Sequence, residues 1–416
     1  MYRRALAAWC LYDFGIASWP VVVATFIWGA YYATAIRRSP EDGAAEWGAT
    51  LALAGFVVAM IGPVLGAIAD RGGARKPWIG CFVMLCAAFT AFLWFSLPEP
   101  ESGSRTLLLV GAASIAYEFS LIFYNAMLRD IVAPDRMGRL SGWGWGSGYA
   151  GGLICLAIGL YGFIKADPPP FGLERAFAEP VRATALLVAA WICIFTLPLF
   201  GLVPDRRSTG LTPWRAVSAG LRGLGVSLMR LPRQPQILRF LLARMIYGDG
   251  LNTLFIFGGI YAAGTLGFTI PEVALLGIAI NATAGAGAIA LAWLDDHIGS
   301  KPMIMISLAA LVVLGTGILL VHDKTLFWAL ALLLGVFVGP AQSASRTFMA
   351  RLCPPAAEAE MFGLYALTGK ITAFIGPALY GLATHVWESQ RAGMASVVAF
   401  LLLGLLLLLT VREPRK

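Results

Sequence analysis

Five ionisable side chains lie deep inside long apolar stretches of this 416-residue sequence: Asp13, Glu118, Arg244, Asp249 and Lys370. A charge at the centre of a lipid bilayer costs roughly 2.5–3.5 kcal/mol on insertion scales, so such groups must pair, line an internal cavity or change protonation. Because burial favours the neutral form of a carboxyl group, each of the three acids could hold a proton at neutral pH. Carboxylates and a lysine around one cavity would suit a solute with an ammonium and a carboxylate group, such as an α-amino acid. They would equally suit a charge network that only opens and closes.

Each of these residues also has a purely structural alternative. Asp13 lies roughly 10 Å above the start of its helix at about 1.5 Å per residue, and we expect it and Asp249 to face a charged site between helical bundles. The alternative is that each carboxylate only accepts hydrogen bonds from a neighbouring helix. Lys370 lies too deep to reach the surface easily, so it is expected to be a cavity cation or the partner of a carboxylate. Glu118 could function in the cavity or be protonated and packed.

The surroundings of the two aspartates carry further information. Arg244 and Asp249 are five positions apart, about 140° around an α-helix, so they do not share a face. We expect Arg244 to extend toward the membrane surface, with a place in the cavity as the alternative. The segments YDFGIASWP and YGDGLNT around the aspartates contain glycine or proline. Both helices are therefore expected to be weakened there, beside a carboxylate that could gate or contact a ligand.

The composition places the whole chain in a membrane. Hydrophobic residues make up 59% of it and charged residues only 13%, whereas an average soluble domain has about a quarter charged residues. The net charge of +8 does not indicate nucleic-acid binding, because the basic residues fall in short loops rather than in one patch. The six cysteines show no metal-ligand spacing and no disulfide framework. The sequence thus predicts no cofactor, no metal and no nucleic-acid partner.

Hydrophobic length predicts an all-α membrane protein with twelve transmembrane helices, since a span needs about 20 apolar residues. The first is expected to be a retained helix rather than a cleaved signal peptide. The predicted spans are 6–35, 48–69, 78–97, 106–127, 141–164, 183–203, 238–263, 272–293, 303–321, 326–350, 361–384 and 391–411.

The order of the spans predicts the organisation of the chain. A basic linker, 204–237, separates an N-terminal six-helix bundle, 1–203, from a C-terminal bundle, 238–416. Lysine and arginine are concentrated in the loops on the side of both termini, which predicts that this side is cytoplasmic. The stretch Trp214–Leu231 is either an amphipathic helix along the membrane surface or a solvated linker.

The two halves repeat each other. Lys76-Pro77 after the second span corresponds to Lys301-Pro302 after the eighth, and this alignment sets Asp70 opposite Asp295. Asp13 in the first span likewise aligns with Asp249 in the seventh. A third match follows the fourth and tenth spans, where LRDIVAPDRMGRLSG aligns with MARLCPPAAEAEMFG. Matches in the same order predict two equivalent bundles related by an axis along the membrane normal, with a substrate site near the midplane.

These motifs carry a family resemblance over essentially all twelve spans. ADRGGARKP resembles the signature loop of the major facilitator superfamily, and RMIYGDGLNTLFIFGGIYAAGTLGF and GPAQSASRTFMARLCPPAAEAEMFGLYALTGK resemble its "unknown major facilitator" family. That family includes the autophagy-related vacuolar amino-acid effluxers. The resemblance implies the two-bundle major facilitator fold, which opens alternately to each side by rocking one bundle against the other. Ile16 departs from the family pattern, which has asparagine there, so a polar substrate contact is lost.

The resemblance also implies a gate at the cytoplasmic loops, with a solvated charge cluster as the alternative. Asp70 could cap a helix N-terminus across the interface, and Asp296 replaces the arginine in the second-half loop, so the second latch is expected to be weaker. The gating residues are expected to be Asp70, Arg71, Arg75, Lys76, Asp295 and Lys301.

Polar and aromatic residues around the midplane complete the candidate site, although such residues often serve only as contacts between helices. Trp143 and Trp145 are expected to be interface anchors more than ligands. Besides the five ionisable residues, the candidates are Tyr12, Tyr149, Asn252, Asn281, Gln342 and Ser345.

The sequence therefore predicts a secondary active transporter of a small polar solute, such as an amino acid or related zwitterion, with H⁺ as a feasible coupling ion. We expect a monomer in contact with membrane lipids, in a bacterial inner membrane and with both termini cytoplasmic. No P-loop, catalytic triad or metal cluster is present in the sequence, so an enzyme is not expected. The alternatives are a lipid or amphiphile translocator on the same fold and a non-transporting sensor.

Overall fold

The computed structural model describes residues 2–210 and 213–413, and every regular element in these ranges is a helix. Twelve helical spans are long and apolar enough to cross a membrane. The predicted all-α fold with twelve membrane spans is therefore confirmed. In the bounds that follow, α denotes an α-helix and η a π- or 3-10 helix.

The first six spans occupy residues 2–202. Their helices are α1 (Tyr2–Ile16), η1 (Trp19–Phe26), α2 (Trp28–Tyr31), η2 (Tyr32–Ile36), α3 (Pro40–Gly72), α4 (Lys76–Phe92), η3 (Leu93–Phe95), η4 (Pro100–Ser102), α5 (Gly103–Ala126), α6 (Leu128–Ile131), η5 (Pro134–Arg136), α7 (Met137–Ala157), η6 (Ile158–Ile164), η7 (Pro170–Gly172), η8 (Arg175–Phe177) and α8 (Glu179–Leu202).

The last six spans occupy residues 235–409 and follow a linker that contains α9 (Pro213–Arg230) and η9 (Leu231–Arg233). Their helices are α10 (Pro235–Leu266), α11 (Ile270–Ala290), α12 (Ala292–Ile298), α13 (Ser300–Leu320), α14 (Lys324–Leu352), α15 (Glu358–Lys370), α16 (Ile375–Val386) and α17 (Gln390–Leu409).

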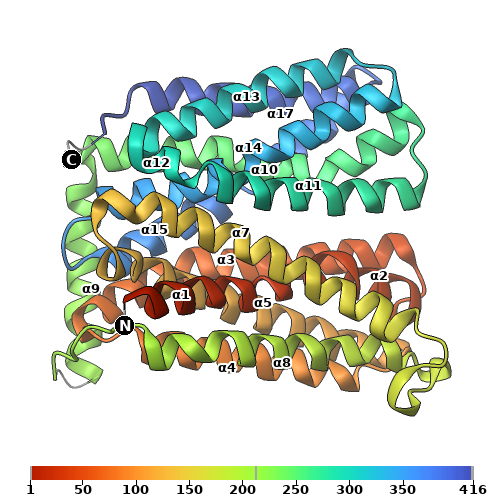
Figure 1. Ribbon diagram of the computed structural model, residues 1–416, viewed down its shortest axis with the longest axis horizontal. Helices are drawn as coiled ribbons and strands as arrows, with labels where there is room; N and C mark the ends of the chain where they lie inside the picture. Colours follow the sequence, from red (N-terminus) through yellow and green to blue (C-terminus); the bar gives the residue numbers. More distant parts are fainter. Residues whose placement is uncertain (1, 211–212, 414–416) are drawn as a thin grey trace.

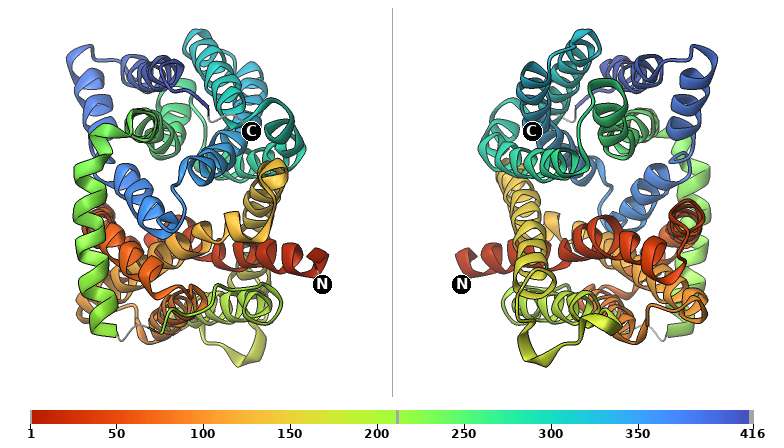
Figure 2. Two further views of the ribbon diagram at one scale, coloured as in Figure 1. Left: turned by 90° about the vertical axis from the view of Figure 1, so that its left-hand side faces the viewer. Right: turned by 90° about the vertical axis from the view of Figure 1, so that its right-hand side faces the viewer.

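The helices form two groups. Figure 1 shows α1–α8 in its lower part and α10–α17 in its upper part, with the two chain ends and α9 at the same end of the molecule. We call this the linker end, and the two groups the first and second halves. In Figure 2, α9 runs across the linker end from the first half to the second. It packs on α3, where Gly220 contacts Ile68.

The linker helix agrees with the helical alternative for Trp214–Leu231, because α9 covers nearly the same residues. Its described side chains include the exposed apolar residues Leu221, Val226 and Met229. Whether these residues lie on a membrane surface stays a prediction.

Local side-chain caps mark the starts of α3, α11 and α14. The Ser39 side chain accepts a hydrogen bond from the backbone of Asp42 at the start of α3, and Pro40 follows the cap. At the start of α11, Thr269 and Glu272 form a capping box in which each side chain bonds the other's backbone N–H. Asp323 caps α14 through the backbone N–H of Leu326 at 2.8 Å. Each cap satisfies an N–H that has no partner within its helix.

The predicted weakening of helices occurs in the first span and not in the seventh. After Ser18 the first span changes from an α-helix to the π-helix η1, which contains Pro20. By contrast, α10 runs without a break through Asp249, so the expected interruption there is wrong. A break occurs instead in the eleventh span, where α15 ends at Lys370 and α16 begins at Ile375.

The two halves meet along two helix pairs, α3 with α15 and α7 with α11. Glycine allows these backbones to approach closely. A Cβ atom on Gly363 would lie 2.6 Å from the carbonyl oxygen of Gly62, and one on Gly146 would lie 2.9 Å from that of Gly285. The halves are thus in backbone contact on both sides of a central space.

Candidate functional site

A cavity of about 870 Å³ lies between the two halves. Its lining comes from both halves and is mainly apolar, and it reaches away from the linker end as far as Ile270, which is 86% exposed at the start of α11. The polar and aromatic lining residues that matter below are Asp13, Asn125, Trp145, Tyr149, Asn281 and Arg346. Of the five ionisable residues singled out in the sequence, only Asp13 lines this central cavity.

Asp13 forms an ion pair with Arg346 across the two halves. Its Oδ2 lies 3.0 Å from Nη1 of Arg346 on α14 and 2.9 Å from the hydroxyl of Tyr124 on α5. Asp13 is 8% exposed and Arg346 3% exposed. The pair is therefore largely shielded from water, and each charge depends on the other half of the molecule for its neutralisation.

Arg346 is held by first-half residues on every side. Its Nε donates to the Ser141 hydroxyl at 2.9 Å and its Nη2 to the Ser141 carbonyl oxygen at 2.6 Å, while Nη1 also reaches Asn125 Oδ1 at 3.3 Å. Its guanidinium carbon lies 4.8, 5.6 and 5.8 Å from the ring centroids of Trp9, Trp145 and Tyr124.

Sequence reasoning missed Arg346 because it stands near the predicted end of its span, where an arginine can extend to the surface. The structure continues α14 to Leu352 and turns Arg346 inward. Trp145, which was expected to anchor at the membrane interface, also lines the cavity.

Lys370 and Glu118 form a second ion pair between the halves. Nζ of Lys370, at the end of α15, lies 2.6 Å from Oε1 of Glu118 on α5. Their side chains are 34% and 20% exposed, so the pair is partly accessible. Lys370 also contacts Gly55 of α3. Neither residue lines the central cavity, and the pair agrees with the alternative for Lys370, in which it is the partner of a carboxylate.

Arg244 points into the second half rather than to the membrane surface. Its Nε donates to the Tyr365 hydroxyl at 3.0 Å, and its guanidinium carbon lies 4.6 Å from the centroid of that ring. The guanidinium nitrogens come within 3.8 Å of a Cβ placed on Gly369, next to Lys370. The expected extension to the surface is therefore wrong, because an aromatic partner inside the bundle holds the cation.

Asp249 caps the second part of the broken eleventh span. Its Oδ2 accepts a hydrogen bond from the backbone N–H of Gly376, in the first turn of α16, at 2.9 Å. Its other oxygen, Oδ1, is buried without a hydrogen-bond partner among the described residues. Asp249 does not line the central cavity. Its contact with Gly376 agrees with the packing alternative rather than with a shared charged site.

The remaining candidates are divided between cavity, core and surface. Tyr149 lines the cavity and its hydroxyl interacts with Gln342. Tyr12 is fully buried and stacks on Tyr124 with centroids 4.2 Å apart. Asn252 is exposed outside the cavity lining. Ser345 shares a 2.7 Å hydrogen bond with Tyr247.

The linker end is closed by two aspartates that cap helices of the opposite half. Asp70, at the end of α3, accepts hydrogen bonds from the backbone N–H groups of Ala359 and Glu360 at 3.1 and 2.9 Å, at the start of α15. Asp296, in α12, accepts from those of Gly138 and Arg139 at 2.7 and 3.1 Å, at the start of α7. We call these two contacts the linker gate.

The gate corrects one detail of the sequence alignment. Asp296 rather than Asp295 caps a helix of the opposite half as Asp70 does, although the alignment on Lys76 and Lys301 sets Asp70 opposite Asp295. Asp296 additionally accepts from Nε of Arg139 at 3.0 Å, while Asp70 lies 3.5 Å from Arg75, so each cap also has an arginine partner. Asp295 instead binds the Ser300 hydroxyl at 2.6 Å and Arg351 at 3.2 Å.

Arginines surround both gate contacts. Arg75, 1% exposed, lies 2.5 Å from Asp130 and 3.1 Å from Glu358 of the second half. Arg206, in the linker, lies 2.7 Å from Asp130 and 3.0 Å from Glu358. Burial raises the pKa of Asp295 to about 6, and the neighbouring Arg351 opposes this shift.

The other predicted gate residues act within one half. Lys76 Nζ donates to the carbonyl oxygen of Phe200 at the end of α8, at 2.8 Å, and Lys301 Nζ to that of Leu409 at the end of α17, at 3.2 Å. The equivalence of the two lysines is thus visible in their contacts. The Arg71 side chain contacts Gly223 of α9 instead of the opposite half.

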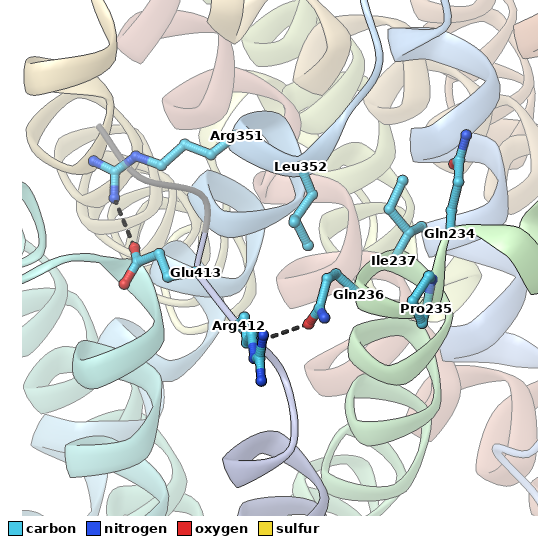
Figure 3. Close-up of a pocket in the computed structure, with 8 residues that line it drawn as sticks. All are labelled: Gln234, Pro235, Gln236, Ile237, Arg351, Leu352, Arg412 and Glu413. Carbon is cyan, nitrogen blue, oxygen red and sulfur yellow. Dashed lines mark hydrogen bonds and ion pairs between the residues drawn. The ribbon is translucent and has the colours of Figure 1, made fainter.

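A second hollow, of about 420 Å³, lies at the linker end and contains none of the five ionisable residues. Figure 3 shows its walls, which come from the start of α10, the end of α14 and the last described residues of the chain. Glu413 lies 3.8 Å from Arg351, and the backbone N–H of Arg412 donates to Gln236. These contacts hold the end of the chain against the second half.

Comparison with known proteins places the chain in a family. A family profile described as "Vacuole effluxer Atg22 like" matches residues 47–416. The chain is 27% identical to the uncharacterised MFS-type transporter YxiO of Bacillus subtilis over 98% of its own length and 94% of that protein. It is 25% identical to autophagy-related protein 22-1 of Penicillium rubens, covering 67% of this chain but only 50% of the fungal protein.

Solved structures show the same fold. The human organic anion transporter MFSD10 superposes with a TM-score of 0.73 at 14% identity, covering 98% of this chain and 99% of that one. The Escherichia coli fucose:proton symporter FucP does so with a TM-score of 0.75 at 13% identity, covering 99% and 98%. The chain belongs to the vacuole effluxer Atg22-like family and is a transporter of the major facilitator superfamily.

Proposed function

We propose that the chain is a secondary active transporter of a small zwitterion such as an amino acid, and that it works by alternating access. The observation that carries this proposal is the Asp13–Arg346 pair, which joins the two halves where the central cavity meets the closed linker end. A carboxylate and a guanidinium side by side offer a partner to each charge of a zwitterion. The family description, vacuole effluxer, supports transport of a solute across a membrane.

The state of the molecule supports a direction of opening. The cavity reaches the end opposite the linker, while Asp70 and Asp296 hold the linker end shut. Because basic residues are concentrated at the linker end, the positive-inside rule supports placing that end in the cytoplasm. The arrangement then corresponds to an outward-facing state in the cytoplasmic membrane of a cell.

Proton coupling forms part of the proposal. Asp13 and Glu118 each take part in an ion pair between the halves. A proton on either carboxylate would weaken its pair and so favour separation of the halves. This links proton binding to the rocking motion without a separate ion site.

Transport by purified protein in liposomes tests the proposal. We expect uptake of a labelled amino acid that depends on a pH gradient, and at least a tenfold loss of rate for Asp13→Asn, a change of about 1.4 kcal/mol in barrier. Lys165→Met serves as the control, because Lys165 is exposed and contacts only Tyr161 among charged or aromatic partners in the described chain. An Asp13→Asn variant that transports amino acids at the normal rate would contradict the proposal.

A second candidate, transport of an amphiphile, is favoured by the mainly apolar lining of the cavity. The same liposomes can be loaded with a fluorescent lipid whose movement between leaflets is followed by quenching. Lipid movement that is unchanged in Asp13→Asn, together with no uptake across an amino-acid panel, would replace the first candidate by the second. Failure of both assays with folded protein would favour a sensor.

A further inference from the structure

The residues around Arg346 form a cation site that belongs to the first half alone. We call Trp9, Asp13, Tyr124 and Trp145 the aromatic box; they come from α1, α5 and α7. A carboxylate next to aromatic faces is the arrangement that binds ammonium groups in proteins. The cation inside the box, Arg346, comes from the opposite half.

Opening of the linker end must remove this cation from the box. The Ser141 hydroxyl donates to the carbonyl oxygen of Ser343 at 2.8 Å, so α7 and α14 touch at the depth of Arg346. The gate contact of Asp296 with Gly138 lies at the start of the same helix α7. When α14 moves away from α7 and α1, Arg346 moves with its helix.

An empty box would leave Asp13 without its cationic partner. Asp13 is 8% exposed while Arg346 is in place, so withdrawal of Arg346 leaves a carboxylate that favours another cation. The indole N–H groups of Trp9 and Trp145 are already buried without a hydrogen-bond partner among the described residues. The box therefore offers an incoming solute a carboxylate, aromatic faces and two free donors.

We propose that Arg346 occupies, in the linker-closed state, the place that the ammonium group of the solute takes in the linker-open state. This inference rests on the proposed function and specifies it: the solute carries an ammonium or quaternary ammonium group, and it competes with a side chain of the transporter itself. A solute bound in the box stabilises the open linker end, because it binds only the state from which Arg346 has withdrawn.

The buried thiol of Cys353 reports the state of the linker end. Cys353 is 3% exposed between α14 and α15, beside the gate, and its carbonyl oxygen accepts from Arg129. Opening of the gate exposes it to alkylation by a maleimide, which mass spectrometry of its peptide quantifies. No substitution is needed for this readout.

The test adds tetramethylammonium chloride to the unaltered protein in detergent. We expect faster alkylation of Cys353 with tetramethylammonium but not with sodium chloride or with tert-butanol, a neutral molecule of similar shape. In Arg346→Met, which removes the competing positive charge from the box, tetramethylammonium should bind at least about tenfold more tightly. The double variant Asp13→Asn/Arg346→Met should lose this binding, and Lys165→Met should behave as the unaltered protein.

The outcomes separate this inference from the proposed function. If tetramethylammonium leaves Cys353 alkylation unchanged or slows it, the inference is overturned, whether or not Arg346→Met folds. If alkylation responds in this way while liposomes take up no amino acid, the box stands and the proposed zwitterion transport fails. If amino-acid uptake occurs and tetramethylammonium does not change the alkylation of Cys353, the proposed zwitterion transport stands and the inference about the box fails.

Discussion

The Asp13–Arg346 pair has different consequences for the two residues. Arg346 makes four hydrogen bonds, to Asp13, Ser141 and Asn125, so it loses only part of its support when the carboxylate is removed. Asp13 relies on Arg346 and the Tyr124 hydroxyl, so it loses a larger share of its polar contacts when the pair is broken. Each charge of the pair is neutralised by the other, and this holds only while α1 and α14 remain in contact.

Asp13→Asn should lower the free energy of unfolding by about 3 kcal/mol, because breaking a buried pair leaves one charge uncompensated. Adding Arg346→Gln to it should cost less than the sum of the single changes. Thermal unfolding in detergent across the four proteins of this double-mutant cycle measures the coupling. Asp167→Asn is the control: its exposed pair with Arg175 should contribute less than about 1 kcal/mol. Additive effects of the Asp13 and Arg346 changes would contradict the pairing.

At the scale of the element, the broken eleventh span has a clear physical cause. Pro377 has no N–H for the carbonyl of Ala373, and its ring disfavours a helix that continues from the preceding turn. Pro63, Pro198 and Pro340 lie inside α3, α8 and α14 without breaking them. Proline alone is therefore not sufficient to break a helix. After the break, the Asp249 side chain caps the start of α16.

Removal of that cap should act on α16 alone. Asp249→Ala leaves the backbone N–H of Gly376 without its acceptor and should cost about 1 kcal/mol. Asp249→Asn keeps an oxygen in the same place and should be nearly neutral. Hydrogen exchange of the α16 amides distinguishes them: exchange should be faster in the alanine variant only. Equal exchange in both variants would show that the cap does not hold the helix.

The α3–α15 contact predicts another effect at this scale. A methyl group on Gly363 would meet the backbone of Gly62 at 2.6 Å, so Gly363→Ala should push the two helices apart and raise the alkylation rate of Cys353. Gly381→Ala in α16 is the matched control, since nothing lies within 4 Å of its added methyl group. A Gly363→Ala variant with the control's alkylation rate would mean that the contact does not keep the linker end closed.

For the whole molecule, the sequence predicts the features that depend on neighbouring residues and not those that depend on how the helices dock. The twelve spans follow from length and hydropathy, and the equivalence of Lys76 and Lys301 follows from repeated motifs, so both could be derived without coordinates. The pairing of Lys370 with Glu118 and of Asp13 with Arg346 could not, because it depends on which face each helix presents after the halves dock. Pro377 was a usable signal for the break in the eleventh span, and it was overlooked.

Protonation of Asp295 should favour the closed linker end, in the opposite sense to protonation of Asp13 in its ion pair. With a pKa of about 6, raised by burial, Asp295 binds more protons in the closed state than it would when solvated, near its usual value. Its neighbours in this site are Arg351, Asp296 and Ser300. Lowering the pH from 7 to 5 therefore adds stability to the closed state, and this contribution is absent above about pH 7.

Distances between spin labels on the two halves measure this shift. Exposed positions at the linker end, Asp135 in the first half and His297 in the second, accept the labels. From pH 7 to pH 5 the population with a short distance should shift further toward closure in the unaltered protein than in Asp295→Asn. A pH response that is identical in Asp295→Asn would assign it to another group.

The two aspartate caps of the linker gate are reciprocal: each half lends one carboxylate to a helix start of the other. Rupture of one cap while the second survives would tilt the halves about the surviving contact instead of parting them evenly. Such an intermediate, with one cap broken, would leave one helix start and one carboxylate without their hydrogen bonds. It would still not admit a solute. Opening of the linker end should then be a single cooperative event, with partly open forms too scarce to leak ions.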